Sequence, residues 1–248
     1  MNILVCISHV PDTTSKINFS DDSTSFNTDG IQFIINPYDE FGLTKAIKLK
    51  NKHGGKVTVI HYGPVSSEPT LRKALAIGAD EAIRIDGQPE DSFSVAKALS
   101  KVIEEHRFDL IIAGRESIDY NGGAVPAMIA ELLDLPFVNA CTGLDVSGSE
   151  VKMEREIEGG KEFVNAILPV IIAGQKGLVE ESDLIIPNMR GIMTARTKPL
   201  SVVDDGNHLS KCHSVSFEKP PVKQACKMID AGQEKELVTL LHQEAKVI

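Results

Sequence analysis

A polar, glycine-bearing loop between an apolar run and a helical segment is the part of the sequence best suited to hold an anion. It reads Gly114-Arg-Glu-Ser-Ile-Asp-Tyr-Asn-Gly-Gly-Ala-Val-Pro126. Gly122 and Gly123 lie where the next helix is expected to begin, so their backbone N–H groups can approach a phosphate with no Cβ in the way. A helix N-terminus also favours an anion. The same spacing fits a plain strand-to-helix turn, because a pair of glycines is a weak signal.

Two further segments have the same relation to a strand or a helix. Ser8-His9-Val10-Pro11 follows the first apolar run, and Asn36-Pro37-Tyr38-Asp39 immediately precedes a helical segment. In an open parallel sheet, ligands bind outside the carboxyl ends of the strands. We therefore expect these segments to meet the loop at one edge of a sheet.

Motifs of bond-making enzymes are missing from the sequence. There is no Walker A, G-x-G-x-x-G, S-G-G-x-D-S, G-x-S-x-G or H-E-x-x-H pattern, and the seven histidines have no convincing nucleophile or carboxylate near them in sequence. Cys6 and His61 lie inside apolar runs, which is typical of core positions. These absences favour a binding or carrier role.

A second kind of signal is the segment from Leu184 to Met193. Three aliphatic residues precede Pro187, and two methionines and Arg190 follow. If this segment is exposed, it forms a docking patch, because apolar groups rimmed by charge mark protein interfaces. An edge strand tucked onto the core fits the composition equally well.

The elements that must position these segments alternate between strands and amphipathic helices. The predicted strands are Ile3–Ile7, Val57–His61, Ala82–Ile85, Leu110–Ala113 and Phe137–Val138. The helical apolar stripes are Leu43, Ala46 and Ile47, ending at Gly54; Leu71, Ala74 and Leu75, ending at Gly78; Val95, Leu99, Val102 and Ile103, capped by Asp91-Ser92; and Val125, Met128, Ile129, Leu132 and Leu133. This alternation predicts a doubly wound α/β fold with a mostly parallel sheet covered on both faces.

Three stretches depart from the alternation. Residues Thr14 to Phe33 are polar and predict an excursion, with a hairpin closed near Asp29-Gly30. Leu144 to Val151 and Ile157 to Val164 predict a β-hairpin, after which Pro169 to Ala173 rejoins the main sheet. From about residue 184 the chain is expected to be an extended arm with little helix before Glu234 to Ala245. Such an arm needs a surface to lie on.

The net charge and the cysteines limit the kinds of partner and of site that the sequence allows. The net charge of −9 argues against a general nucleic-acid binder, because neutralising phosphates needs a basic field. The four cysteines are scattered, which predicts reduced thiols with neither disulfides nor a metal site. Met1 runs into Ile3 with no leader, and no apolar stretch is long enough to span a bilayer. We expect a soluble, cytoplasmic protein without a membrane segment.

The run from Arg155 to Ala173, REIEGGKEFVNAILPVIIA, closely resembles the signature of the electron transfer flavoprotein beta subunit. Asn36-Pro37-Tyr38-Asp39, the Ala76 to Asp80 segment, Gly114 to Pro136 and Pro187-Asn188 follow in that family's order. The resemblance covers essentially the whole chain. It implies an adenine nucleotide alpha hydrolase-like α/β fold, with residues 1–190 as a nucleotide-binding domain and 191–248 as a C-terminal arm and helix packing on a partner subunit.

The resemblance also implies a function. The protein would be an electron carrier and not an enzyme, pairing with an alpha subunit to complete a shared FAD site. It would pass electrons from an acyl-CoA dehydrogenase or a similar flavin dehydrogenase to an acceptor. The family holds AMP in the beta subunit, and electron-bifurcating members hold a second FAD there. The loop ending Gly122-Gly-Ala-Val-Pro126 matches neither pattern fully, so both ligands remain open.

Site residues follow by position in the family. Nucleotide contacts are expected from Cys6, Asn36, Pro37, Tyr38, Asp39, Tyr62, Gly114, Arg115, Glu116, Ser117, Asp119, Asn121, Gly122, Gly123, Ala124 and Val125. Tyr38 would approach the flavin ring carried by the alpha subunit. Ile186, with Pro187 and Asn188, would anchor the client dehydrogenase, and Glu156 would pair with a basic group of the alpha subunit.

A rival interpretation is a stand-alone ATP- or AMP-binding protein of universal-stress type, acting as a sensor or an ATP-using enzyme. A third is a purely structural partner whose loop binds nothing. Co-purification with a larger, yellow subunit distinguishes the first interpretation from both.

Overall fold

One sheet of nine strands organises the chain in the computed structural model, which describes residues 1–206, 210–223 and 225–248. Its order is β11-β5-β4-β1-β6-β10-β7-β8-β9. The strands are β1 (Asn2–Cys6), β4 (Lys56–Tyr62), β5 (Glu81–Asp86), β6 (Leu110–Gly114), β7 (Phe137–Ser147), β8 (Glu150–Ile157), β9 (Gly160–Ile167), β10 (Val170–Gly174) and β11 (Leu200–Asp204). All pairs are parallel except β7–β8 and β8–β9.

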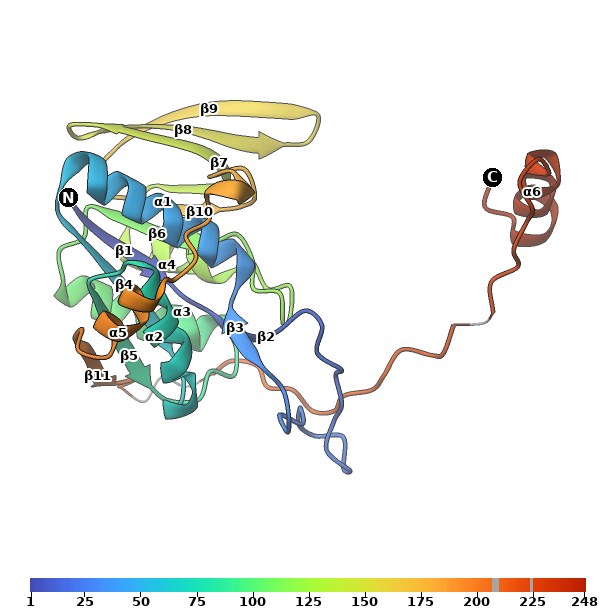
Figure 1. Cartoon of the computed structure of the whole chain (residues 1–248), viewed down its shortest axis with the longest axis horizontal. Coiled ribbons are helices and arrows are strands. Elements are labelled where there is room, and N and C mark those ends of the chain that lie inside the picture. Colours follow the sequence, from blue (N-terminus) through green and yellow to red (C-terminus); the bar gives the residue numbers. More distant parts are fainter. Residues whose placement is uncertain (207–209, 224) are drawn as a thin grey trace.

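Helices cover both faces of the sheet, as predicted (Figure 1). Ile3 and Val5 of β1 pack in one core cluster, to which the helices α1 (Pro37–His53) and α2 (Glu68–Ile77) contribute. Leu4 and Cys6 point the other way, into the cluster of α3 (Ser92–Glu105) and α4 (Val125–Leu133). Successive side chains of a strand face opposite sides, so a strand covered on both faces must be apolar throughout.

Local sequence signals set the first and last residues of these helices where the sequence analysis indicated. Gly54 and Gly78 follow the last residues of α1 and α2. Asp91 caps α3 through a capping box with Ser94. The predicted doubly wound fold is therefore confirmed.

The direction of winding reverses beside β1. From β1 the chain builds β4 and β5 on one side, then crosses to β6 and later β10 on the other. Loops leaving β1 and β6 consequently diverge. In doubly wound sheets this switch point is where a crevice opens.

The excursion after β1 is closed differently from the prediction. β2 (His9–Pro11) and β3 (Phe33–Ile35) form an antiparallel pair, and the tip lies between Phe19 and Phe26, where Ser20 N donates to Ser25 O at 2.9 Å. Asp22 sets this tip, because its carboxylate accepts from the Ser20 hydroxyl and the Thr24 amide. Gly30, with φ +71°, only bends the chain before β3, so the predicted closure at Asp29-Gly30 was wrong.

The predicted hairpin is confirmed, but it has a third strand. β7 starts parallel to β10 and continues antiparallel to β8, and the pairing register shifts near Cys141 on both sides. Ala140 adopts φ +54° at this point, a conformation uncommon for a residue with a Cβ. One continuous strand thus joins the parallel sheet to the antiparallel β8–β9 pair.

The extended arm begins later than predicted. Helix α5 (Met189–Ala195) packs on α2, and β11 pairs with β5. Two short helices, η1 (Val65–Ser67) and η2 (Glu181–Asp183), precede α2 and α5 respectively. Arg72 fixes this connection by donating to the carbonyls of Ala195 and Lys198, each at 2.8 Å. Strand β11 was not predicted, because most of its residues are exposed and its sequence lacks the apolar pattern of a buried strand.

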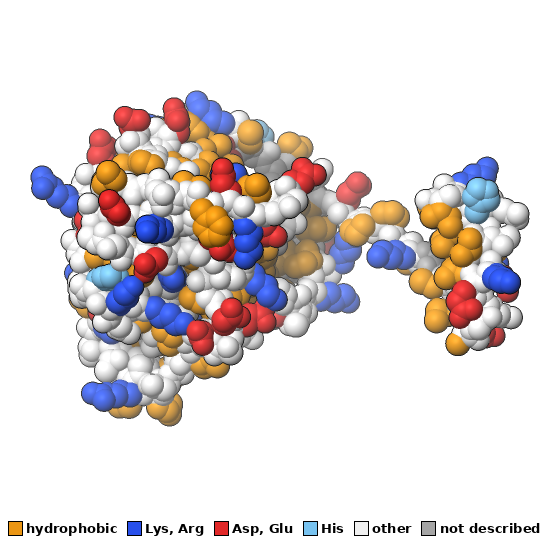
Figure 2. All heavy atoms as spheres, turned by 90° about the horizontal axis from the view of Figure 1, so that it is seen from above, with side chains coloured by type: hydrophobic (Ala, Val, Ile, Leu, Met, Phe, Trp, Pro, Cys, Tyr) orange, Lys and Arg blue, Asp and Glu red, His pale blue; other side chains and the backbone are white. Residues whose placement is uncertain are grey.

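Only beyond β11 does the chain leave the body. It runs extended to α6 (Glu234–Leu240) and a π-helical turn, η3 (Leu241–Ala245), which together match the helix predicted from Glu234 to Ala245. Figure 1 shows α6 well away from the sheet, and Figure 2 shows apolar side chains gathered on it. The division at residues 190 and 191 stays a prediction. No helix in the described part of the chain is both long and apolar enough to cross a membrane.

Gly191 should be intolerant of a side chain. A Cβ there would lie 2.5 Å from the carbonyl oxygen of Ala76 in α2, so Gly191→Ala should push α5 off α2. We expect a loss of about 1–3 kcal/mol in the free energy of unfolding and faster tryptic cleavage at Arg190. Gly160→Ala is the control, since its Cβ would meet open space. Equal stability of the two variants would contradict this packing.

Candidate functional site

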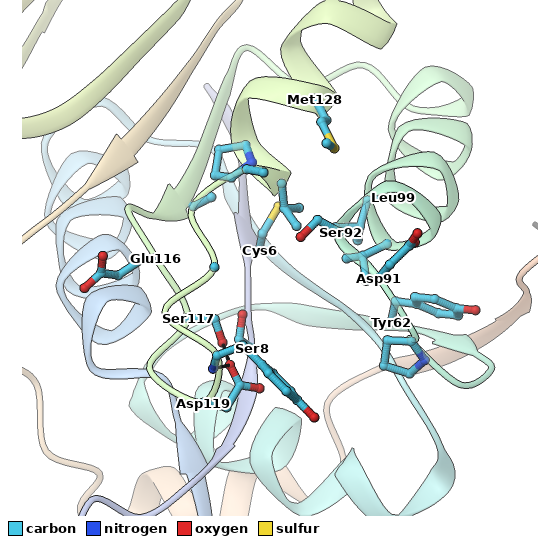
Figure 3. Close-up of a pocket in the computed structure, with 18 of the residues that line it drawn as sticks. Cys6, Ser8, Tyr62, Asp91, Ser92, Leu99, Glu116, Ser117, Asp119 and Met128 are labelled. Carbon is cyan, nitrogen blue, oxygen red and sulfur yellow. Dashed lines mark hydrogen bonds between the residues drawn. The ribbon is translucent and has the colours of Figure 1, made fainter. Parts of the chain in front are cut away.

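A cavity of about 780 Å³ lies at the carboxyl ends of the central strands. Cys6 of β1, Tyr62 of β4 and Gly114 of β6 line it, and the first residues of α3 and α4 approach it from the other side. Figure 3 shows Cys6, Ser92 and Tyr62 around this space, with Met128 of α4 above it. The volume is in the range of small-molecule and cofactor sites.

The buried carboxylate of Asp39 ties the two sides of the switch point together. Its Oδ2 accepts from the Ser8 amide, just after β1, at 2.7 Å, and its Oδ1 accepts from the Gly114 amide, at the end of β6, at 2.8 Å. Burial raises the pKa of the Asp39 carboxyl to about 7, against the opposing effect of hydrogen bonds from Ser8, Asn36 and Gly114. A Cβ on Gly114 would lie 2.2 Å from Oδ1, so glycine is required there.

Asn36, also buried, holds the loop after β6. Its Nδ2 donates to the Glu116 carbonyl at 2.9 Å, and its Oδ1 accepts from the Ile118 amide at 3.3 Å. The prediction placed Asn36 to Asp39 before the helix. In the structure, Pro37, Tyr38 and Asp39 form the first turn of α1, with Asn36 as the N-cap residue. Asn36 and Asp39 therefore position the loop from below, and only Asp39 of the two lines the cavity.

The loop itself is a tight turn. Ser117 and Gly122 form a β-bridge, with Ser117 N donating to Gly122 O at 3.0 Å, and Asn121 takes the left-handed conformation at φ +51°. Helix α4 begins after it, at Val125. The amides of Gly123 and Ala124 donate no hydrogen bond within the described residues. They are available to a ligand at a helix N-terminus.

A second helix N-terminus faces the cavity, which the sequence analysis did not include in the site. Asp91 and Ser92, at the start of α3, line the cavity together with Pro89 and Glu90 (Figure 3). Asp91 accepts from Ser94 N at 2.7 Å and from the amides of two residues of the arm. The N-cap signal at Asp91-Ser92 marked the helix, and the strand-end rule could have marked the site.

Segments far apart in sequence complete the wall. Lys211, Cys212 and Ser214 of the arm line the cavity. Nothing in their local sequence indicates a site, because the contact exists only once the arm crosses the carboxyl edge of the sheet.

Ten of the sixteen predicted nucleotide contacts line the cavity. Three lie on strands or α1: Cys6, Asp39 and Tyr62. Seven come from the loop and the start of α4: Gly114, Glu116, Ser117, Asp119, Gly122, Ala124 and Val125. The other six do not line it: Asn36, Pro37, Tyr38, Arg115, Asn121 and Gly123. Which of these residues touch a ligand stays a prediction.

Cys6, His61 and Tyr62, which line the cavity, have pKa values far from neutrality, unlike Asp39. Burial, and then the charge of Asp39, raise the pKa of the Cys6 thiol to about 12. Burial lowers the pKa of His61 to about 4, and its Nδ1 lies 2.8 Å from the Ile7 carbonyl. Both residues are buried, as predicted. Tyr62 has its pKa raised to about 12 by burial and by Asp205.

Two predicted contacts that do not line the cavity, Tyr38 and Arg115, interact with neighbouring side chains. Burial and then Glu116 raise the pKa of Tyr38, whose hydroxyl contacts that carboxylate. Arg115 donates to the Gln175 side-chain carbonyl at 2.9 Å, and the Gln175 amide donates to Glu156. Gln175 is buried, and it can bridge a donor and an acceptor because its amide offers both functions. Glu156 is thus linked to the loop.

The predicted docking segment is exposed. Ile186, Met189 and Met193 have 85%, 76% and 69% of their surfaces accessible. Asn188 caps α5 by accepting from Gly191 N at 2.8 Å, so its side chain has a structural role. In the described residues, no group of three or more His, Cys, Asp or Glu side chains is arranged to hold a metal ion. The four cysteines are free.

The fold and the cavity define a doubly wound α/β protein with a ligand-sized crevice at its switch point. Residues 24–207 match the family model described as the electron transfer flavoprotein domain. The chain is 37% identical to the electron transfer flavoprotein subunit beta of Bacillus subtilis (strain 168), with 100% of both chains covered. It is 31% identical to the Homo sapiens subunit of that name, with 94% of each chain covered. The chain belongs to the electron transfer flavoprotein beta-subunit family, which confirms the expected resemblance.

Asp39 should give the protein a distinctive dependence of stability on pH. Its carboxyl pKa is near 3.8 when unfolded and about 7 when folded. A raised pKa means that its contribution is full below pH 4 and is lost as pH rises to 7, by up to about 1.4 kcal/mol per pH unit. The free energy of unfolding of the wild type minus that of Asp39→Asn, measured by urea unfolding from pH 5 to 8, should fall as the pH rises. A difference that is flat, or that rises with pH, would contradict the assignment.

Proposed function

We propose that the protein is the beta subunit of a heterodimeric electron transfer flavoprotein, holding an adenine nucleotide in the switch-point cavity. The observation that carries this proposal is the cavity of about 780 Å³ beside the loop at Gly122–Val125. Family membership over the full chain supports the pairing with an alpha subunit and the electron-carrier role. The protein itself would make and break no covalent bonds.

The residues around the cavity fit a nucleotide. The unpaired amide of Ala124, a residue that lines the cavity, precedes α4, and Gly122 leaves room for a phosphate to approach. Apolar side chains such as Val95, Leu99 and Met128 provide a surface for a purine ring. AMP is our first choice of ligand, and the adenine nucleotide part of a second FAD would use the same donors.

FAD shared with the alpha subunit would supply the redox chemistry. This chain would contribute the surface that faces the partner, with Tyr38 near the flavin ring. Glu156 is exposed at the end of β8, held by Gln175, and available to a basic group of the alpha subunit. The arm and the apolar side of α6 would bury their exposed residues on the same subunit.

Client docking would use Ile186 and the neighbouring methionines. Exposed aliphatic and methionine side chains on a short, capped helix form an adaptable apolar surface. We propose an acyl-CoA dehydrogenase or a similar flavin dehydrogenase as the client, with Ile186 as the anchor and Pro187 and Asn188 shaping the segment.

Counting bound small molecules tests the whole proposal. The heterodimer, purified with its alpha subunit and denatured, should release one FAD and one AMP, measured by liquid chromatography. Two FAD and no AMP would assign a second flavin to the cavity. A colourless homodimer that binds ATP and Mg²⁺ would contradict the proposal and support a stand-alone nucleotide-binding protein.

Docking is tested separately with Ile186→Ala. The loss of an interface anchor should slow electron exchange with the dehydrogenase about tenfold or more, measured as the rate of flavin reduction. FAD and AMP contents should not change. Val65→Ala, another exposed aliphatic residue on the same body, is the control. A loss of flavin in Ile186→Ala would overturn the docking role.

A further inference from the structure

The arm that leaves β11 forms one wall of the cavity. The backbone amides of Lys211 and Cys212 donate to Asp91 Oδ2 at 2.6 and 2.9 Å. Burial opposes ionisation of Asp91, but hydrogen bonds from the amides of Ser94, Lys211 and Cys212 lower its pKa to about 2. A permanently charged carboxylate at the start of α3 thus holds this part of the arm in place.

The same arm is fixed a second time further along. Phe217 stacks on Phe19 of the excursion with ring centroids 5.2 Å apart, and its amide donates to Ser23 O at 2.8 Å. Lys219 donates to Asn18 at 2.7 Å. Two anchors, one at Asp91 and one at the tip of the excursion, therefore define the path of residues 211–217.

This path brings Lys211 to the cavity beside the start of α3. Its Nζ lies 5.6 Å from the centre of the Phe93 ring, in the first turn of α3. Ser92, the preceding residue, has its hydroxyl 4.0 Å from the position that a Cβ on Gly122 would occupy. Gly122 thus lies close to the start of α3, and Lys211 packs against the same turn of α3.

The charges around the cavity make this lysine important. Carboxylates of Asp39, Glu90, Asp91, Glu116 and Asp119 are among the lining groups, and Lys211 is the one Lys or Arg among the described residues that line the cavity. Backbone amides and helix N-termini provide partial charges only. A phosphate that enters a site rimmed by carboxylates needs a full positive charge nearby.

We propose that Lys211 is the residue that makes the cavity selective for a phosphorylated nucleotide, by pairing its ammonium group with the phosphate, and that Asp91 is its positioning residue. This inference rests on the proposed nucleotide-binding function. The ligand class is a nucleoside phosphate, as opposed to a nucleoside or a free purine. The arm is thereby part of the ligand site as well as the path to the partner subunit.

The test compares AMP with adenosine, which lacks only the phosphate. The heterodimer is freed of AMP with its FAD retained, and both affinities are measured by calorimetry. Lys211→Met should weaken AMP binding about tenfold or more and leave adenosine binding unchanged. Lys211→Arg should retain most of the preference for AMP. Lys223→Met, which removes an exposed arm lysine that does not line the cavity, is the matched control and should behave as wild type.

Asp91→Asn tests the positioning role. Asparagine still caps a helix well, but it cannot accept from Ser94 and both arm amides as the carboxylate does. AMP affinity should fall with adenosine affinity unchanged, and trypsin should cleave after Lys211 faster than in wild type.

The outcomes separate this inference from the function on which it rests. If the wild type binds AMP and Lys211→Met binds it equally well, or loses AMP and adenosine to the same extent, the lysine is not the phosphate partner and this inference fails alone. If the wild type binds neither AMP nor FAD at this site, the proposed function fails and takes this inference with it.

Discussion

The site depends on one buried carboxylate at the point where the sheet reverses its winding. Strands β1 and β6 are neighbours, but the loops that leave them diverge, so nothing in the sheet's own hydrogen bonds fixes their ends relative to each other. Asp39 supplies this fixation by accepting from the amides of Ser8 and Gly114. Two strand ends, the first turn of α1 and the loop over the cavity are thereby held as one unit.

The sequence was sufficient for the elements whose patterns are local. The uniformly apolar β1 and β6, the capped α3 and the apolar face of α4 could each be predicted from a few neighbouring residues. Strand β11 could not, because an edge strand with three of its five residues exposed resembles a loop in composition. The tip of the excursion was missed for a different reason: hydrogen bonds of the Asp22 side chain closed it, instead of a glycine.

The site was predictable only in part. Cys6 and Tyr62, the last residues of β1 and β4, were assigned from the family resemblance, while the fold rule pointed to the loop that contains Gly122, because that loop follows β6. Asn36 was predicted to contact the ligand, and its side-chain amide forms hydrogen bonds with the backbone of the loop. The polarity of a residue cannot distinguish this structural role from ligand binding. Lys211 carries no local signal at all, since a distant carboxylate brings it to the cavity. Long-range placement is the information that spacing in one sequence lacks.

The unbroken strand β7 has a mechanical consequence. Its first residues pair with β10 in the parallel sheet, while its second half carries β8 and β9 beyond that sheet, with the left-handed Ala140 where the two halves meet. A small change of twist at Ala140 would move the β7–β8 turn between Ser147 and Glu150 most, whereas Glu156 lies close to Ala140, because Arg155 pairs with Cys141. The outer end of the β7–β8 hairpin can therefore be reoriented through one strand, while the Gln175 bridge keeps Glu156 joined to Arg115 of the loop.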